Sequence, residues 1–260
     1  MTATSTPMIT IAGVSKSFPT PDGQIVTALE AVDLSIGASE IVSIVGPSGC
    51  GKSTLLYMVA GLVQPSNGEI GVAGRRVTGP DPQVGIVFQE FRIFPWKTVR
   101  ENVMFGLELQ RKGDARQRAE MADKYIQLVG LGGFENRLPK ELSGGMKQRV
   151  AIAQTFACDP DVVLMDEPLG SVDSLTREKL QDELLRIWSE SRKTIVVVTH
   201  SIEEAIYLGQ RVVVMAPRPS RVVAAFDVPL PHPRTADMRT GPVMAELRGK
   251  IWDLVRGGIV

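Results

Sequence analysis

The sequence has little of what a disulfide-rich or zinc-binding protein needs. Among its 260 residues there are only two cysteines and two histidines. The cysteines, Cys50 and Cys158, show no Cys-x-x-Cys spacing, and the histidines are not clustered. A disulfide framework and a structural zinc site are therefore both disfavoured.

Long apolar runs and an excess of one charge are also missing. The longest apolar stretches, such as 195–198 and 212–215, have the length of a strand and fall far short of a membrane-spanning helix. Residues 1–7 contain neither a basic head nor an apolar segment, so we expect no export signal and a cytoplasmic location. Basic and acidic residues number 29 each, so no global field points to nucleic acid or to an anionic membrane surface. Any connection to a membrane must then come through a partner.

What the sequence does contain is organised around a glycine-rich turn. An apolar run at 41–45 precedes this turn and another at 55–60 follows it, which predicts a strand, a turn and a helix. Glycines let successive backbone N–H groups point at phosphate oxygens, beside the positive end of the helix. Lys52 is then expected to reach the β- and γ-phosphates, and the Ser53 hydroxyl to ligate Mg²⁺. The residues of this predicted phosphate loop are Gly46, Pro47, Ser48, Gly49, Cys50, Gly51, Lys52, Ser53 and Thr54.

The N-terminal part predicts an antiparallel sheet beside the strand that carries the phosphate loop. Residues 9–11 and 29–36 are typical of strands, and 69–77 are typical of a hairpin. Phe18 precedes the first turn and is a candidate to stack on an adenine ring. A single aromatic serves core or loop packing more often, so both interpretations stay open.

From residue 91 to residue 157 the apolar spacing changes from that of strands to that of helices. This change predicts an inserted helical subdomain. One helix face is expected to hold Met121, Tyr125, Leu128 and Val129. The segment 91–96 is unusually apolar for a connection, so it is either core below the subdomain or a docking surface for another protein's helix.

Polar residues suited to phosphoryl chemistry follow three predicted buried strands. Gln89, Asp166 and His200 each stand where such a strand ends, and α/β sheets bind ligands outside the carboxyl ends of their strands. Asp166 is suited to hold Mg²⁺, and Glu167 to orient or deprotonate the attacking water. A lone histidine is usually structural, but His200 is placed to contact a γ-phosphate.

A second anion site is predicted where the helix after residue 142 begins. Ser143 is a plausible N-cap, and Gly144 and Gly145 expose the N–H groups of the first turn. The simpler alternative is an ordinary capped helix start.

These elements, in this order, resemble the ATPase subunit of an ATP-binding cassette (ABC) transporter. The stretch Ser-Gly-Gly-Met-Lys-Gln at 143–148 discriminates, because other phosphate-loop families lack it. The resemblance implies an α/β P-loop NTPase (RecA-like) core with a flanking antiparallel β-subdomain and an inserted α-helical subdomain. We expect one ABC ATPase domain over 1–260. Its parts are the core with the β-subdomain at 8–90 and 158–232, the helical subdomain at 91–157 and a C-terminal helical tail at 233–260.

The resemblance also implies roles within one chain, with ATP and Mg²⁺ bound. Phe18 would stack on adenine, and Gln89 would link the metal and the attacking water to membrane subunits. Ser53, Gln89 and Asp166 would serve the metal. Glu167 would serve the attacking water, and His200 would contact the γ-phosphate, which makes Glu167, His200 and Gln89 the expected catalytic residues.

Other roles would be exercised on a second copy of the chain. Ser143, Gly144, Gly145 and Gln148 would close over the nucleotide bound by that copy, and Asp173 would lie across the seam between the two. Two ATP molecules would thereby be buried between two head-to-tail chains.

Finer matches point to a subgroup. The stretches 88–96, 175–181 and 217–222 resemble the importers of nitrate, sulfonates and taurine. This implies uptake of a small anionic solute through transmembrane permease subunits that dock near Phe91 and Trp96, with a periplasmic solute-binding protein as an indirect partner. The chain would lie on the inner face of the plasma membrane. Ser201 follows His200 where the family usually has aspartate.

Other functions stay open at this stage. An ABC ATPase of repair or translation usually carries two cassettes or a long coiled-coil insertion, and this chain has room for neither. A nucleotide-gated binding module would not need Glu167 and His200. The cassette of an exporter is the third alternative.

Overall fold

The structure, a computed structural model, describes residues 7–170 and 172–257. The chain forms two compact units. Unit 1 comprises Met1–Asp81 and Arg192–Val260, and unit 2 comprises Pro82–Ser191. Among the described residues, no helix combines the length and the apolar character needed to cross a membrane.

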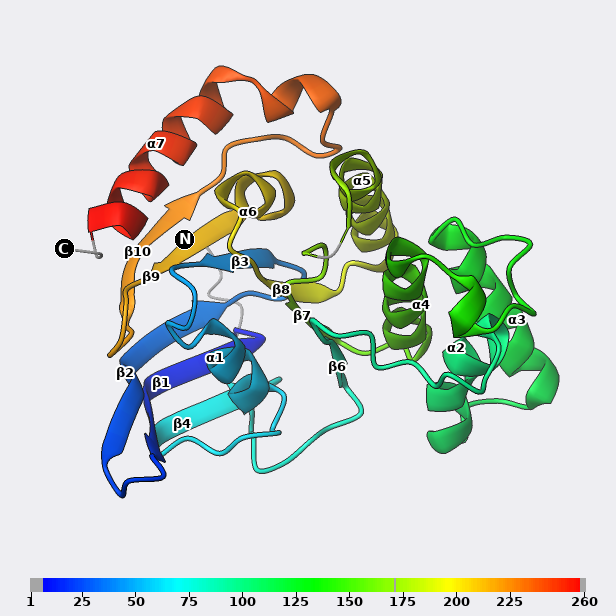
Figure 1. The fold of residues 1–260 in the computed structure, drawn as a ribbon, viewed down its shortest axis with the longest axis horizontal. Helices are drawn as coiled ribbons and strands as arrows, with labels where there is room; N and C mark the ends of the chain where they lie inside the picture. Colours follow the sequence, from blue (N-terminus) through cyan, green and yellow to red (C-terminus); the bar gives the residue numbers. More distant parts are fainter. Residues whose placement is uncertain (1–6, 171, 258–260) are drawn as a thin grey trace. The chain divides into compact units, whose positions relative to one another are not determined.

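Unit 1 contains an antiparallel sheet with the strand order β2-β1-β4-β5. The strands are β1 (Ile9–Pro19), β2 (Ile25–Ile36), β4 (Asn67–Val72) and β5 (Arg75–Arg76). Figure 1 shows β1, β2 and β4 side by side. Ile9, Val14, Leu29 and Val32 are fully buried on one face of this sheet, which confirms the strands expected in the N-terminal part.

Unit 1 also contains a parallel group with the strand order β10-β9-β3-β8. The strands are β3 (Ile41–Val45), β8 (Thr194–Val198), β9 (Arg211–Met215) and the antiparallel edge strand β10 (Val222–Asp227). Every residue of β3 and β8 is buried, as expected for parallel strands covered on both faces. The helices of unit 1 are α1 (Lys52–Val59), α6 (Ile202–Leu208), the 3₁₀ helix η2 (Ala236–Arg239) and α7 (Pro242–Gly257).

The C-terminal helix α7 lies along α6 and β9 (Figure 1). Met244, Leu247 and Ile251 form its buried stripe, in register with a helical period. Leu254, which continues the same stripe in the sequence, is 39% exposed. The last turn of the described helix is therefore only loosely packed.

Unit 2 pairs the parallel strands β6 (Val84–Val87) and β7 (Val162–Asp166) and carries most of the helices. These are α2 (Val99–Leu109), α3 (Ala115–Leu128), the 3₁₀ helix η1 (Pro139–Glu141), α4 (Gly144–Ala157) and α5 (Ser174–Ser191). Helices α2, α3 and α4 pack on one another. They form the helical bundle that the sequence predicts between residues 91 and 157.

Two expectations for unit 2 were wrong in detail. Of the expected helix face, Tyr125 and Val129 are buried and Leu128 is half-buried, but Met121 is exposed, and Ala122 and Ile126 complete the buried face. Strand β6 is not fully buried, because only Val87 is buried and the other three residues are half-buried. Strand β6 lines a cavity, as described below, which explains its partial exposure.

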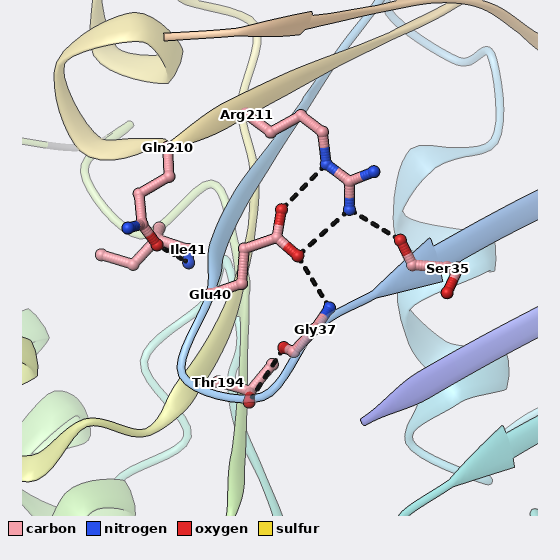
Figure 2. A network of polar contacts seen from close by, with 7 residues as sticks. All are labelled: Ser35, Gly37, Glu40, Ile41, Thr194, Gln210 and Arg211. Atoms are coloured by element: carbon pink, nitrogen blue, oxygen red, sulfur yellow. Dashed lines mark hydrogen bonds and ion pairs between the residues drawn. The ribbon is translucent and has the colours of Figure 1, made fainter. Parts of the chain in front are cut away.

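A polar network fixes the turn between β2 and β3 in unit 1 (Figure 2). The Arg211 guanidinium donates to both carboxylate oxygens of Glu40 at 2.8 and 3.2 Å, and to the Ser35 carbonyl at 2.6 Å. The Glu40 carboxylate also accepts from the Gly37 N–H at 2.7 Å. The network ties the end of β2, the start of β3 and the start of β9 together, at the opposite end of these strands from the phosphate loop.

Candidate functional site

The predicted phosphate loop joins β3 to α1 in unit 1. Its N-cap residue Gly51 has φ 107° and Gly49 has φ 74°, a left-handed conformation that favours glycine. A Cβ on Gly51 would lie 2.9 Å from Leu29 Cδ2, and one on Gly46 would lie 2.7 Å from the Met215 carbonyl oxygen. No side chain caps α1, so the N–H groups of its first turn are suited to an anion.

The Lys52 side chain arches back over this loop. Its ammonium donates to the carbonyl oxygens of Gly46 at 2.9 Å and Pro47 at 3.0 Å. The Cys50 thiol lies 3.9 Å from the same ammonium and is almost completely buried, as expected of an inert small residue. A lysine ammonium held beside a loop whose backbone N–H groups bind anions supplies positive charge for phosphate oxygens.

His200 stands beside the phosphate loop at the end of a neighbouring strand. Strands β3 and β8 are parallel and pair Ile44 with Val198. The Thr199 N–H also donates to the Ile44 carbonyl oxygen at 3.1 Å. The structure thus places His200, which is exposed, at the same carboxyl edge as the residue where the loop begins.

Two other side chains of unit 1 are candidates to contact a nucleotide. Phe18 lies on β1 and is 40% exposed, with the Lys16 ammonium 5.0 Å from its ring centre, so its ring is accessible for stacking. Arg218, which the sequence reasoning did not single out, lies next to the phosphate loop. Its guanidinium is 3.8 Å from the position that a Cβ on Gly49 would take.

In unit 2 the parallel pair β6 and β7 brings two predicted catalytic residues together. Gln89 Nε2 donates a long hydrogen bond of 3.4 Å to Glu167 Oε2. Asp166 ends β7 with only 1% of its surface exposed. Glu167 has φ 45°, a left-handed conformation that is unusual for a residue with a side chain and that occurs preferentially at functional sites.

The predicted second anion site is also formed within unit 2. Ser143 is the N-cap of α4, and its hydroxyl accepts from the Met146 N–H at 3.3 Å. Ser143 and Gly144 are exposed, whereas the Gln148 side chain is buried. Asp173 is exposed and caps the start of α5 by accepting from the Thr176 N–H at 3.0 Å.

The apolar segment 91–96 is not core. None of its six residues is buried, and the Trp96 side chain is 72% exposed. The Phe94 ring packs edge-on against Phe105, with ring centres 4.5 Å apart. The docking interpretation is therefore the one that the burial of this segment favours.

A buried asparagine that the sequence reasoning missed shapes this segment. Asn102 is fully buried on α2; its Oδ1 accepts from the Phe94 N–H at 2.7 Å. Its Nδ2 donates to the carbonyl oxygens of Phe94, Lys97 and Thr98 at 3.2, 3.0 and 2.9 Å. The signal in the sequence was a polar residue on the apolar face of a predicted helix, between Val99 and Val103.

A cavity of about 440 Å³ lies within unit 2, against β6, α2 and α4. Phe88, Phe105 and Leu109 are among its apolar lining residues. Cys158 also lines it, and burial raises the pKa of the Cys158 thiol, so this cysteine is not a reactive thiolate. One of the lining residues, Phe88, directly precedes Gln89 in the sequence.

Comparison with known proteins gives consistent matches. Residues 29–170 match the family model described as "ABC transporter". The taurine import ATP-binding protein TauB of Roseobacter denitrificans is 46% identical over 255 residues, covering 95% of this chain and 94% of that protein. The dimeric bacterial ABC transporter cassette MJ0796 matches with a TM-score of 0.77 and 35% identity, covering 85% of this chain and 99% of the cassette. The same cassette in its post-hydrolysis state with ADP and phosphate gives a TM-score of 0.77 and 34% identity, with the same coverage. The fold class predicted from the sequence is confirmed.

Proposed function

Because this chain belongs to the ABC transporter family, we propose that it is the ATP-hydrolysing subunit of a bacterial importer for a small anionic solute such as taurine. The nitrate, sulfonate and taurine group was the expectation from the sequence. The name of the relative from Roseobacter denitrificans supports the taurine type within that group.

The phosphate loop would bind the triphosphate of ATP. Its left-handed glycines and the uncapped start of α1 present N–H groups, and Lys52 supplies a charge that reaches the β- and γ-phosphates. Phe18 would stack on the adenine ring. His200, at the adjacent strand end, would contact the γ-phosphate.

Magnesium would be held by the Ser53 hydroxyl, the Gln89 side-chain oxygen and the Asp166 carboxylate. These are hard oxygen donors, which is the ligand type that Mg²⁺ prefers, and the ion keeps several waters of its own. When bound, it neutralises the charge that develops on the transferred phosphoryl group.

The hydrogen bond between Gln89 and Glu167 is the observation that carries the hydrolytic role. It sets an amide beside a carboxylate at the edge where β6 and β7 end, so a water could be oriented by both. Glu167 would take up or share the proton of the attacking water, and Gln89 would hold that water in line. The left-handed backbone of Glu167 supports a positioned rather than a merely solvated carboxylate.

Two copies of the chain would close on two ATP molecules. Ser143 and Gly144, exposed at the start of α4, and the half-buried Gly145 would bind the nucleotide on the phosphate loop of the other copy. The buried side chain of Gln148, on α4, would support this contact, and Asp173 would lie at the interface between the two copies. The dimeric state of the MJ0796 cassette supports this arrangement.

The permease would dock on the segment 91–96 and the adjoining cavity. Trp96 offers a large exposed ring, and the cavity beside Phe88 could receive an apolar side chain of a partner helix. Docking would hold the chain peripherally on the inner face of the plasma membrane. A periplasmic solute-binding protein would act on the permease from the other side.

Replacement of Glu167 by glutamine tests the catalytic role. We expect Glu167→Gln to lower the ATP turnover number by about 10²- to 10⁴-fold, because the carboxylate that accepts the proton is removed. ATP binding should change less than twofold, since Glu167 is not part of the phosphate loop. Phosphate release and nucleotide affinity are measured on the same preparation.

Glu120→Gln is the matched control, because Glu120 is an exposed glutamate of the same unit whose carboxylate pairs with Arg116 on the surface of α3. It should turn over at the parental rate. Hydrolysis by Glu167→Gln at the parental rate would contradict the assignment of that residue. An unsubstituted protein that binds ATP and releases no phosphate would favour a nucleotide-gated binding module.

The importer role is tested by growth. A strain lacking this chain is expected to lose growth on taurine as sole sulfur source and to regain it with the parental chain, but not with Glu167→Gln. Growth of the deletion strain at the parental rate on taurine, and on other sulfonates, would remove this solute class from the proposal.

A further inference from the structure

The backbone around His200 is fixed by a buried carboxylate from the next helix. Glu204 lies in the first turn of α6 and is 5% exposed, and Thr199 is 1% exposed. The Thr199 hydroxyl donates to Glu204 Oε2 at 3.0 Å. Thr199 directly precedes the exposed His200 in the sequence, and Glu204 follows His200.

This arrangement differs from the capping boxes at the starts of α2 and α3. In α2 and α3 the capping box is direct, because the third residue of the helix accepts from the N–H of the N-cap residue itself. The Glu101 carboxylate accepts from the Thr98 N–H at 2.7 Å, and the Gln117 side chain accepts from the Asp114 N–H at 2.9 Å.

In α6 the Thr199 hydroxyl lies between the N–H of the N-cap residue and the carboxylate of the third helix residue, and it relays the interaction between them. The N-cap Ser201 accepts from the Glu204 N–H at 3.2 Å through its side chain, as an N-cap should. Its own N–H, however, donates at 3.1 Å to the Thr199 hydroxyl, which passes the interaction on to Glu204. The ring of hydrogen bonds therefore spans the residue before His200 and the residue after it.

The relay needs a hydrogen-bond acceptor at position 204. A hydroxyl has one hydrogen to donate, and an ionised carboxylate can only accept. Donation to Glu204 leaves the lone pairs of the Thr199 oxygen available for the Ser201 N–H. A glutamine could still accept through its amide oxygen, as Gln117 does in α3, whereas a leucine removes the acceptor.

The relay is also anchored to the strand that leads into the phosphate loop. The Thr199 N–H donates to the Ile44 carbonyl oxygen at 3.1 Å, two residues before Gly46. The His200 side chain is exposed, and its backbone lies between two members of the relay, Thr199 and Ser201. The relay holds that backbone relative to β3.

We propose that Thr199 and Glu204 are positioning residues for His200. They hold its imidazole at the place where it meets the γ-phosphate of the nucleotide on the phosphate loop of the same chain. This inference rests on the proposed function, in which His200 makes that contact. Neither residue touches the nucleotide, and both act through the backbone of His200.

The test measures the ATP turnover number and the ATP dissociation constant for Thr199→Val, Thr199→Ser and Glu204→Leu. Thr199→Val and Glu204→Leu are expected to lower turnover by about 10- to 100-fold, because the catalytic contact is misplaced. The dissociation constant should change less than twofold. Thr199→Ser, which keeps the hydroxyl, should retain most of the turnover.

Glu246→Leu is the matched control. Glu246 is an exposed glutamate of the same unit, on α7, and pairs with Lys250 on the surface at 2.7 Å. It should behave as the parental chain. Thermal unfolding identifies any variant that does not fold, and Thr199→Val, which preserves the shape of the side chain and removes only the hydroxyl, tests the relay even if Glu204→Leu does not fold.

A double-mutant cycle with His200→Ala separates positioning from general stability. In the His200→Ala background, Thr199→Val should lower turnover no further, because its target is already absent. An equal loss in both backgrounds would overturn the relay, and so would parental turnover of Thr199→Val beside a strongly impaired His200→Ala. Parental turnover of His200→Ala itself would instead remove His200 from the proposed function, and the relay with it.

Discussion

Removal of the Arg211 guanidinium is expected to destabilise unit 1 through the network of Figure 2. In Arg211→Met the side chain keeps much of its length but loses both hydrogen bonds to Glu40 and the one to the Ser35 carbonyl. Glu40 keeps only the Gly37 N–H among the partners drawn in the network. A partly buried carboxylate is then left without its cation.

The magnitude follows from the exposure of the pair. The Arg211 and Glu40 side chains are 24% and 22% exposed, which places them between an exposed and a buried ion pair. Truncation of one partner costs about 0–1 kcal/mol for an exposed pair and about 3–5 kcal/mol for a buried one. We therefore expect a loss of about 2 kcal/mol in the free energy of unfolding. For a chain of this size, that corresponds to a melting temperature lower by about 4–8 °C.

The assay is thermal and denaturant unfolding of Arg211→Met, Glu40→Gln and the double variant. The double variant should lose less than the sum of the single variants, because each single change already breaks the same bonds. The control is Arg116→Met, whose ion pair with Glu120 is 87% and 62% exposed and should contribute less than about 0.5 kcal/mol. Equal, small losses for Arg211→Met and Arg116→Met would refute the reasoning.

Three further predictions concern the phosphate loop and the tail. Gly51→Ala forces a left-handed alanine against Leu29 and should cost about 1–3 kcal/mol and weaken ATP binding. Gly249→Ala lies in open space on α7 and should instead raise the free energy of unfolding by about 0.5–1 kcal/mol. Denaturant unfolding measures the stability of both variants, and a nucleotide titration measures the ATP binding of Gly51→Ala. Burial, and then the nearby Arg234 and Arg192, lower the pKa of His232 from its ordinary 6.5 to about 4. Between these two values the unfolded chain takes up a proton that the folded chain does not, so stability falls with falling pH, and His232→Gln should flatten the melting temperature against pH in that window.

The parts of the site that the sequence predicted are those that local patterns encode. A strand of apolar residues, a run of glycines and a lysine suffice to locate the phosphate loop, because each requirement is met within a dozen consecutive residues. The same holds for Asp166 and His200, each of which lies at the carboxyl end of a short buried strand. The parallel pairing of these strands then brings their ends to one edge in each unit.

The parts that the sequence did not predict depend on contacts between segments. Met121 was preferred for the buried face of α3 because it is large and apolar. The helix instead buries Ala122, whose small side chain is fully enclosed in the bundle. Asn102 and Glu204 are polar residues on otherwise apolar helix faces, and only the backbone groups beside them explain their burial.

Unit 2 contains a short covalent path between the expected permease contact and the catalytic edge. Strand β6 ends at Val87, and two residues later the Gln89 side chain donates a hydrogen bond to Glu167. The exposed segment 91–96 follows Gln89 after one residue. Asn102 holds the middle of this segment through Phe94 and the residue after it through the Lys97 carbonyl oxygen, whereas the bond from Gln89 to Glu167 is long, at 3.4 Å. We therefore expect a displacement of the segment to be taken up more easily on the side of Gln89. A partner that binds two positions of this segment with different affinity would then shift the hydrogen bond to Glu167, and nucleotide hydrolysis would shift the affinity for the partner in return.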